Sequence, residues 1–199
     1  MDAIEFATKA HEGQIRKYTG EPYINHPKEV DELFSLMLTG CTPCEIAALT
    51  QGMKSPISGL ESAHRAAWLH DVIEDCGVTE HDLLGLFDED TVTLVKGLSD
   101  DKENPLKLNR ATRKEVSRNR LRKSSLMTRF LKVADLIHNM RSIMIYDKDF
   151  GTIFLSELEI IRADELFMSG MPSVAVVLLD THIIFAQLII KAYHKDKRK

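Results

Sequence analysis

The sequence has few cysteines and gives no basis for a disulfide framework. Cys41, Cys44 and Cys76 make an odd number, which is typical of proteins from reducing compartments. Cys41 and Cys44 form a Cys-x-x-Cys pair, but a structural zinc site requires a second pair, and no alternation of strands and helices surrounds this one as in redox proteins. We therefore interpret both as incidental cysteines near the start of a helix.

The sequence also lacks a leader and a long uninterrupted apolar segment. Its first residues contain neither a cationic region nor an apolar run, so no signal peptide is predicted. The apolar segment 174–190 is interrupted by Asp180, His182 and Gln187 and falls short of the roughly 20 apolar residues that a membrane span requires. We expect a buried or dimer-forming helix here, in a cytoplasmic protein without membrane contact and with a homo-oligomer as one option.

An overall excess of positive charge is absent as well. The 199 residues carry a formal net charge of −4, which argues against general nucleic-acid binding. Residues 107–132 nevertheless contain ten Lys or Arg and a single acid, Glu115. This segment has no series of aromatic side chains for base stacking, so a nucleotide polyphosphate fits it better than RNA, and a solvated helical face is the alternative.

Convincing strand patterns are missing, whereas helical spacing of apolar residues recurs along the chain. The length and an apolar share of 44% suit one globular domain, residues 1–199, with an all-α fold. Residues 40–62 are the least regular, with one or two helical turns allowed at 45–53 and a loop at 54–59. Helices are expected at residues 2–12, 27–38, 63–75, 79–87, 90–97, 131–141 and, after a break at Phe150 and Gly151, at 152–168 and 173–194, followed by a disordered basic tail at 195–199.

The densest group of ionisable residues lies in residues 68–75 (WLHDVIED). On a helix, His70 and Glu74 are four residues apart, and so are Asp71 and Asp75, so both pairs stack on one face beside apolar side chains. Burying several carboxylates is unfavourable unless a cation compensates them, and a divalent metal offers two charges at once. A helix N-terminus or a solvated acidic face explains this stretch equally well by itself.

Two other stretches offer further ligands. Asp135, His138 and Asn139 are spaced i, i+3 and i+4, which places them on a common side of a largely apolar helix. His26 precedes Pro27, and proline suits the first turn of a helix, so this imidazole lies at a helix N-terminus. A capping or packing role is the commoner explanation for such a histidine alone.

Two imidazoles and two carboxylates together suit an octahedral metal site with water in the open positions. Mn²⁺ is the preferred ion, with Fe²⁺, Co²⁺ or Zn²⁺ as competitors. A bound metal lowers the pKa of water and neutralises phosphate oxygens, and carboxylates one turn away can orient or deprotonate that water. The pattern therefore predicts a metal-dependent phosphoester hydrolase, with ligands His26, His70, Asp71 and Asp135 and catalytic carboxylates Glu74 and Asp75.

Four stretches in this order resemble the HD-domain metal-dependent phosphohydrolases. More narrowly, they are similar to the hydrolase domain of the RelA/SpoT-type alarmone enzymes and to the small alarmone hydrolases. The stretches are residues 10–17 (AHEGQIRK), 20–27 (GEPYINHP), 68–75 (WLHDVIED) and 132–141 (KVADLIHNMR). An adjacent His and Asp alone would be a weak signal, but four stretches in order over residues 1–145 are specific.

The resemblance implies an HD-domain helical bundle with a single metal site for one Mn²⁺ per chain. It also implies removal of the 3′-pyrophosphate from the alarmone (p)ppGpp, which gives GDP or GTP and pyrophosphate. It carries over the same four ligands and makes Glu74 and Asp75 the catalytic acids. The substrate-binding residues that it implies are Arg16, Lys17, Lys102 and Asn139.

Three departures from the family pattern leave the substrate open. His26 and His70 are 44 residues apart, more than is usual, so we expect an insertion at about 41–62. Leu136 stands where a basic residue is common, and residues 153–158 lack the basic and tyrosine side chains that similar enzymes place near the nucleotide. The alternatives are hydrolysis of (p)ppApp or of the NADPH 2′-phosphate, and a nucleotide-sensing module without catalysis.

Overall fold

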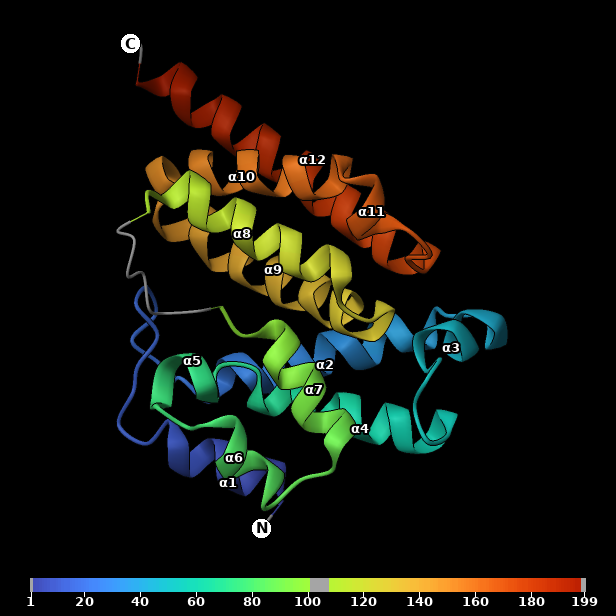
Figure 1. Ribbon diagram of the computed structural model, residues 1–199. Helices are drawn as coiled ribbons and strands as arrows, with labels where there is room; N and C mark the ends of the chain where they lie inside the picture. Colours follow the sequence, from blue (N-terminus) through green and yellow to red (C-terminus); the bar gives the residue numbers. More distant parts are fainter. Residues whose placement is uncertain (1, 101–107, 198–199) are drawn as a thin grey trace.

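The computed structural model describes residues 2–100 and 108–197, and they form the predicted all-α fold (Figure 1). Within these residues, β structure is limited to an isolated bridge between Ile15 and Pro22. The helices are α1 (Ala3–Ala10), α2 (Asn25–Thr39), α3 (Pro43–Leu49), α4 (Pro56–Leu69), α5 (Val72–Cys76), α6 (Glu80–Leu84), α7 (Glu89–Leu98), α8 (Arg110–Lys123), α9 (Leu126–Tyr146), α10 (Lys148–Ala163), α11 (Glu165–Met168) and α12 (Ser173–Asp196).

Helix α9 forms the centre of the core. It packs against α2 and α7 on one side and against α10 and α12 on the other (Figure 1). Phe130 and Ile137 are among its fully buried side chains. A helix enclosed on two sides also buries its polar residues, so Asp135 and His138 must find partners inside the protein.

Polar side chains cap most of the helix starts. Thr42 and Thr79 form complete capping boxes with Glu45 and Asp82. The other N-cap side chains that accept a hydrogen bond from first-turn amides belong to Asp2, Ser55, Asp88, Asn109, Ser125, Asp147 and Asp164. These caps satisfy amides that have no partner within the helix, so they determine where the helices begin.

Helix α4 begins earlier than the sequence pattern predicts. The loop expected at 54–59 ends at Ser55, whose hydroxyl accepts a hydrogen bond from the amide of Ser58. Pro56 then occupies the first helical turn, where a missing amide hydrogen costs nothing. The helical turns allowed at 45–53 correspond to α3, which ends at Leu49, whereas the loop predicted at 54–59 is wrong, because α4 begins at Pro56. The interpretation of residues 41–62 as an insertion stays a prediction.

The prediction of a single helix at 63–75 is wrong. The chain forms α4 and α5 instead, with a turn at His70 and Asp71 between them. The hydroxyl of Ser99 lies 3.3 Å from the main-chain carbonyl of His70 and 2.9 Å from that of Val95, so the end of α7 adjoins this turn. Gly77 ends α5 with φ +70, in the left-handed region that favours glycine, as predicted.

The C-terminal helices also differ from the expected boundaries. The break expected at Phe150 and Gly151 does not exist, because Gly151 lies buried within α10, close to Met144 of α9. The helix expected at 152–168 ends at Ala163 instead. Asp164 then caps the short helix α11 and pairs with Arg122 at 2.6 Å.

Helix α12 buries one face and exposes the other. Leu179 and Ile183 are among its buried residues, whereas Ile184, Phe185 and Leu188 are exposed. By length and composition alone α12 could cross a membrane, which the interrupted sequence pattern did not suggest. It packs against α9 and α10 in this fold (Figure 1). It also extends to Asp196, into the tail that was expected to be disordered.

The Cys-x-x-Cys pair shows no sign of metal or redox chemistry. Cys41, Cys44 and Cys76 form no disulfide. Burial, together with nearby Glu45, raises the pKa of Cys41 to about 11, whereas reactive cysteines have a lowered pKa. This supports the interpretation of Cys41 and Cys44 as incidental residues.

Candidate metal and phosphate site

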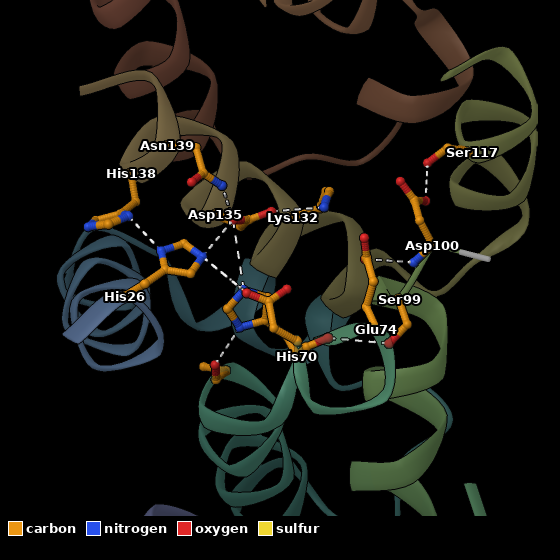
Figure 2. A network of polar contacts seen from close by, with 12 residues as sticks. His26, His70, Glu74, Ser99, Asp100, Ser117, Lys132, Asp135, His138 and Asn139 are labelled. Carbon is orange, nitrogen blue, oxygen red and sulfur yellow. Dashed lines mark hydrogen bonds and ion pairs between the residues drawn. The ribbon is translucent and has the colours of Figure 1, made fainter. Parts of the chain in front are cut away.

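The four predicted ligands converge in the structure. His26 comes from the first turn of α2, His70 and Asp71 from the turn between α4 and α5, and Asp135 from the middle of α9. Figure 2 shows His26, His70 and Asp135 side by side. The Nε2 atoms of His26 and His70 are 3.2 Å apart. The Nε2 atom of His26 is 3.4 Å from Asp71 Oδ2 and 3.3 Å from Asp135 Oδ1.

These distances fit a shared divalent cation. Ligand atoms of one octahedral ion, each at about 2.1 Å from it, lie about 3 Å from their neighbours. His70 Nε2 lies 3.1 Å from Asp71 Oδ2 and 3.8 Å from Asp135 Oδ1. His26, His70 and Asp71 form a group whose ligand atoms all lie within 4.8 Å of one another, and Asp135 Oδ1 approaches both imidazoles of this group. Nitrogen and oxygen donors in this ratio suit Mn²⁺, Fe²⁺, Co²⁺ or Zn²⁺.

The charges at the centre favour a cation. Burial by itself would raise the pKa of Asp71, but the imidazoles of His70 and His26 hold that pKa well below its ordinary value. Burial likewise opposes a charged His70, yet Asp71 and Asp135 raise its pKa to about 9. The buried carboxylates thus create a negative potential that positive charge relieves.

Lys132 is an important neighbour of the site that the sequence analysis did not assign. Its Nζ donates to Asp135 Oδ2 at 2.8 Å, while the other oxygen of Asp135 faces the imidazoles (Figure 2). Burial opposes ionisation of Lys132, but Asp135 and Asp100 raise its pKa. An Asp held in this way offers one oxygen to a metal. The sequence feature that could have identified Lys132 is its position three residues before Asp135 in a largely apolar helix.

The two candidate catalytic carboxylates lie on α5 with different partners. Glu74 accepts a hydrogen bond from the amide of Asp100 at 3.2 Å, and burial raises the pKa of Glu74 (Figure 2). The carboxylate of Asp75 lies within hydrogen-bond distance, 3.1 Å, of the Tyr23 hydroxyl. The same hydroxyl lies 2.7 Å from Asp71. Tyr23 was also missed, although it stands three residues before His26.

The residues expected to contact substrate lie in different parts of the structure. Arg16 donates to the Asn139 side-chain oxygen at 3.1 Å, and Asn139 donates to Asp135 at 2.6 Å, so both adjoin the ligand cluster. Lys17 is exposed and lies 3.7 Å from Asp147. Lys102 lies outside the described residues. Their contacts with substrate stay predictions.

His138 lies beside His26 on the side away from the ligand cluster (Figure 2). Its Nδ1 is 2.7 Å from His26 Nδ1, and its Nε2 is 2.7 Å from Glu29 Oε2. Burial and the neighbouring His26 lower the pKa of His138. The sequence analysis noted its spacing but assigned it no role.

The basic segment 107–132 is largely neutralised within the chain. Bidentate hydrogen bonds of 2.7 and 2.9 Å join Arg110 to Glu157, and Arg120 lies 2.6 Å from Asp100. Further ion pairs in the described part of this segment join Lys114 to Asp100, Arg118 to Glu115 and Arg122 to Glu115 and Asp164. Charges that are already paired attract a polyanion or RNA less, so this pairing favours the solvated-face interpretation.

The family model described as HD domain matches residues 3–149. The chain belongs to the HD-domain family. Over 146 residues this HD-domain chain is 30% identical to guanosine-3′,5′-bis(diphosphate) 3′-pyrophosphohydrolase MESH1 of Drosophila melanogaster, covering 73% of this chain and 69% of that protein. Over 143 residues it is 35% identical to the bifunctional (p)ppGpp synthase/hydrolase SpoT of Escherichia coli strain K12.

The HD-domain match covers 69% of this chain but only 17% of SpoT. Two solved structures have a similar fold. A metazoan ortholog of SpoT that hydrolyses ppGpp superimposes with a TM-score of 0.67, covering 90% of each chain at 23% identity. The lmo0812 protein of Listeria monocytogenes gives 0.56, covering 83% of this chain and 99% of that one at 21% identity. The HD-domain fold is thus shared even where identity is low.

Proposed function

We propose that this protein is a Mn²⁺-dependent hydrolase that removes the 3′-pyrophosphate from (p)ppGpp, leaving GDP or GTP. The observation that carries the proposal is the convergence of His26, His70, Asp71 and Asp135 on one centre. Relatives named as 3′-pyrophosphohydrolases of guanosine bis(diphosphate) support this substrate.

The proposed reaction needs a nucleophile, a charge acceptor and a proton donor. A divalent cation bound by the four ligands would supply a more acidic water and neutralise phosphate oxygens. The oxygen of water bonds to the phosphorus at the 3′ position, the bond from that phosphorus to the 3′-oxygen breaks, and a proton reaches the 3′-oxygen. The products are a free 3′-hydroxyl and pyrophosphate.

Glu74 and Asp75 supply the proton acceptor and the proton donor in this proposal. The raised pKa of Glu74 brings the carboxylate nearer to the pH at which it can exchange protons efficiently. The Tyr23 hydroxyl between Asp71 and Asp75 holds Asp75 beside the ligand cluster. Arg16, Lys17, Lys102 and Asn139 are proposed to contact the nucleotide.

The test compares substrates and variants side by side. Purified protein is incubated with ppGpp, pppApp and NADPH, with Mn²⁺ or with EDTA, and products are separated by ion-exchange chromatography. We expect GDP and pyrophosphate from ppGpp only with metal, and no turnover by His70→Ala or Asp71→Ala. Preferred turnover of pppApp or NADPH reassigns the substrate, and metal-free turnover by His70→Ala rules out the mechanism.

The same assay distinguishes catalysis from sensing and identifies the metal. Tight binding of ppGpp without hydrolysis at any of Mn²⁺, Fe²⁺, Co²⁺ or Zn²⁺ would favour a nucleotide-sensing module. We propose Mn²⁺ because two carboxylates and two imidazoles suit it. A cytoplasmic location is also proposed, since the three cysteines form no disulfide.

A further inference from the structure

The two ligand histidines are oriented in different ways. His70 directs its Nδ1 to the main-chain carbonyl of Ala67 at 2.8 Å. A carbonyl can only accept, so this nitrogen of His70 carries a hydrogen, and Nε2 is the nitrogen that a metal would bind. His26 has no such carbonyl in its described hydrogen bonds. Its Nδ1 instead faces another histidine, His138, at 2.7 Å.

An imidazole can either donate or accept at each nitrogen, so His138 by itself does not determine which nitrogen of His26 is protonated. Glu29, the third residue of this hydrogen-bonded row, determines which nitrogen of His138 is protonated. Glu29 Oε2 lies 2.7 Å from His138 Nε2, and a carboxylate only accepts. His138 Nε2 therefore carries the hydrogen, and Nδ1 of the neutral ring is an acceptor. His26 must then donate from Nδ1, which leaves the Nε2 lone pair facing the other ligands.

Helix geometry explains why the three side chains meet. Glu29 is three residues after His26 on α2, and His138 is three residues after Asp135 on α9, so each pair shares a helix face. Because α2 packs against α9, the two faces meet. The hydrogen-bonded row from Glu29 through His138 to His26 thus leads to the cluster that contains Asp135, and Figure 2 shows the part from His138 to His26.

We propose that His138 and Glu29 are positioning residues that hold His26 in the tautomer that binds the metal. The inference rests on the metal site of the proposed function. Outer partners of ligand histidines affect metal affinity by about 10–100-fold. His138 is buried, whereas the Glu29 side chain is 51% exposed, so water can replace Glu29 more easily. His138 is therefore the stronger contributor.

The first test measures Mn²⁺ affinity without nucleotide. Free Mn²⁺ is followed by its electron paramagnetic resonance signal during titration of the chelator-treated protein. His138→Ala is expected to raise the Kd for Mn²⁺ about 10–100-fold. Glu29→Ala is expected to raise the Kd less, and Glu29→Gln, whose amide oxygen still accepts from His138, restores most of the affinity. Equal affinity in the wild type and all three variants would overturn the proposal.

A matched control is available on the same helix. Glu32 lies three residues after Glu29 on α2. Among its described ion pairs it contacts only the exposed Lys28, at 3.8 Å. Glu32→Ala removes the same charge from α2 without touching His138, so its Mn²⁺ affinity is expected to equal that of the wild type. A loss as large as that of Glu29→Ala would assign the effect to general electrostatics and overturn the proposal.

The second test reads the tautomers directly. Two-bond ¹H–¹⁵N spectra of the metal-free protein distinguish imidazoles protonated at Nδ1 from those protonated at Nε2. We expect Nδ1–H for His26 and Nε2–H for His138, with mixed tautomers at His26 in His138→Ala. A wild-type spectrum that shows His138 protonated at Nδ1 would refute the inference, and this result does not depend on whether His138→Ala folds well.

These outcomes separate the inference from the proposed function. Mn²⁺ binding that depends on His138, without hydrolysis of any nucleotide, supports the inference and contradicts the proposed reaction. Hydrolysis of ppGpp by the wild type, with a Kd for Mn²⁺ that is unchanged in the variants, supports the proposed reaction and contradicts the inference about His138. A wild-type protein that binds no Mn²⁺ overturns both.

Discussion

Tyr23 carries one hydroxyl hydrogen between two carboxylates. Asp71 lies 2.7 Å away and Asp75 3.1 Å away. Burial and the two carboxylates raise the pKa of Tyr23, so it stays protonated. Its ring also stacks on His11 at 4.7 Å between centroids, which fixes the hydroxyl in place. One donor therefore aligns Asp71, a proposed metal ligand, and Asp75, a proposed catalytic carboxylate.

Tyr23→Phe keeps the stacked ring and removes only the donor. We expect kcat to fall roughly 10-fold, since a hydrogen bond to a charged group contributes about 1.5–3 kcal/mol and water can partly replace it. Steady-state kinetics with saturating Mn²⁺ measures the change. Tyr193→Phe, which removes an exposed hydroxyl bonded to Asp149, serves as the control with unchanged kcat. A kcat equal to wild type in Tyr23→Phe would contradict the role.

Glu74 is the carboxylate whose pKa favours proton exchange. Glu74→Gln retains an oxygen for the Asp100 amide, so the turn is preserved. We expect turnover to fall by about 10²–10⁴-fold, the usual contribution of a general acid or base. Mn²⁺ affinity, measured by titration, is expected to be retained. Loss of Mn²⁺ binding would instead assign Glu74 to the metal ligands.

At the scale of elements, the site depends on a close approach of α7 to α9. A Cβ on Gly97 would lie 2.8 Å from Cγ2 of Thr128, which is 2% exposed and hydrogen-bonded to Ser125. Thr128 therefore cannot move aside easily. Any shift of α9 would be transmitted along the helix to Asp135, seven residues away.

Gly97→Ala should lower the free energy of unfolding by about 1–3 kcal/mol, the usual cost of overpacking. Urea denaturation followed by circular dichroism measures it. Gly85→Ala is the matched control, because the nearest atom to its added Cβ is 3.7 Å away and its φ is −73. The control should change stability by less than about 0.5 kcal/mol. Equal stability of both variants would show that α7 and α9 can separate freely.

At the scale of the whole molecule, the ligand cluster joins helices from distant parts of the sequence. His26 belongs to α2, His70 and Asp71 to the turn after α4, and Asp135 to α9. A cation bound to all four would stabilise the folded state only, because the unfolded chain does not bring these residues together.

Mn²⁺ at 100 times its Kd should add about 2.7 kcal/mol to the free energy of unfolding. For a chain of this size, that corresponds to a rise in Tm of about 5–11 °C. Differential scanning calorimetry with Mn²⁺ or with EDTA measures the difference. Asp135→Asn should abolish the rise, and a Tm that is equal with Mn²⁺ and with EDTA in the wild type would count against a metal bound by all four residues.

Acid should destabilise the metal-free protein through Asp100 and Asp135. Burial opposes their ionisation, but Lys132 and other donors hold the pKa of both carboxyls below the ordinary value. A carboxyl with a lowered folded-state pKa stabilises the fold above its unfolded pKa, about 3.9, and this stabilisation is lost as pH falls further.

The free energy of unfolding in urea should therefore decrease steeply below about pH 4. Asp100→Asn should flatten this dependence, because it removes one of the shifted carboxyls. Glu32→Ala, which changes an exposed acid, should leave the slope unchanged. An identical slope in Asp100→Asn and the wild type would show that Asp100 does not contribute.

Local patterns in the sequence were sufficient for the class of fold. Apolar spacing predicted an all-α chain but not every helix boundary, and the residues predicted as ligands, His26, His70, Asp71 and Asp135, lie close together in the structure, while their role as ligands stays a prediction. These patterns succeed because side-chain chemistry and helical periodicity are local properties. The family assignment follows from the same residues.

The tertiary structure decided what the local pattern could not. The break at His70 adjoins Ser99 from the end of α7, and the end of α10 adjoins Asp164, which pairs with Arg122 from α8. The hydrogen-bonded row through Glu29 and His138 exists only because α2 and α9 pack together. Such contacts join residues far apart in the chain, and no local sequence pattern encodes which of them will meet.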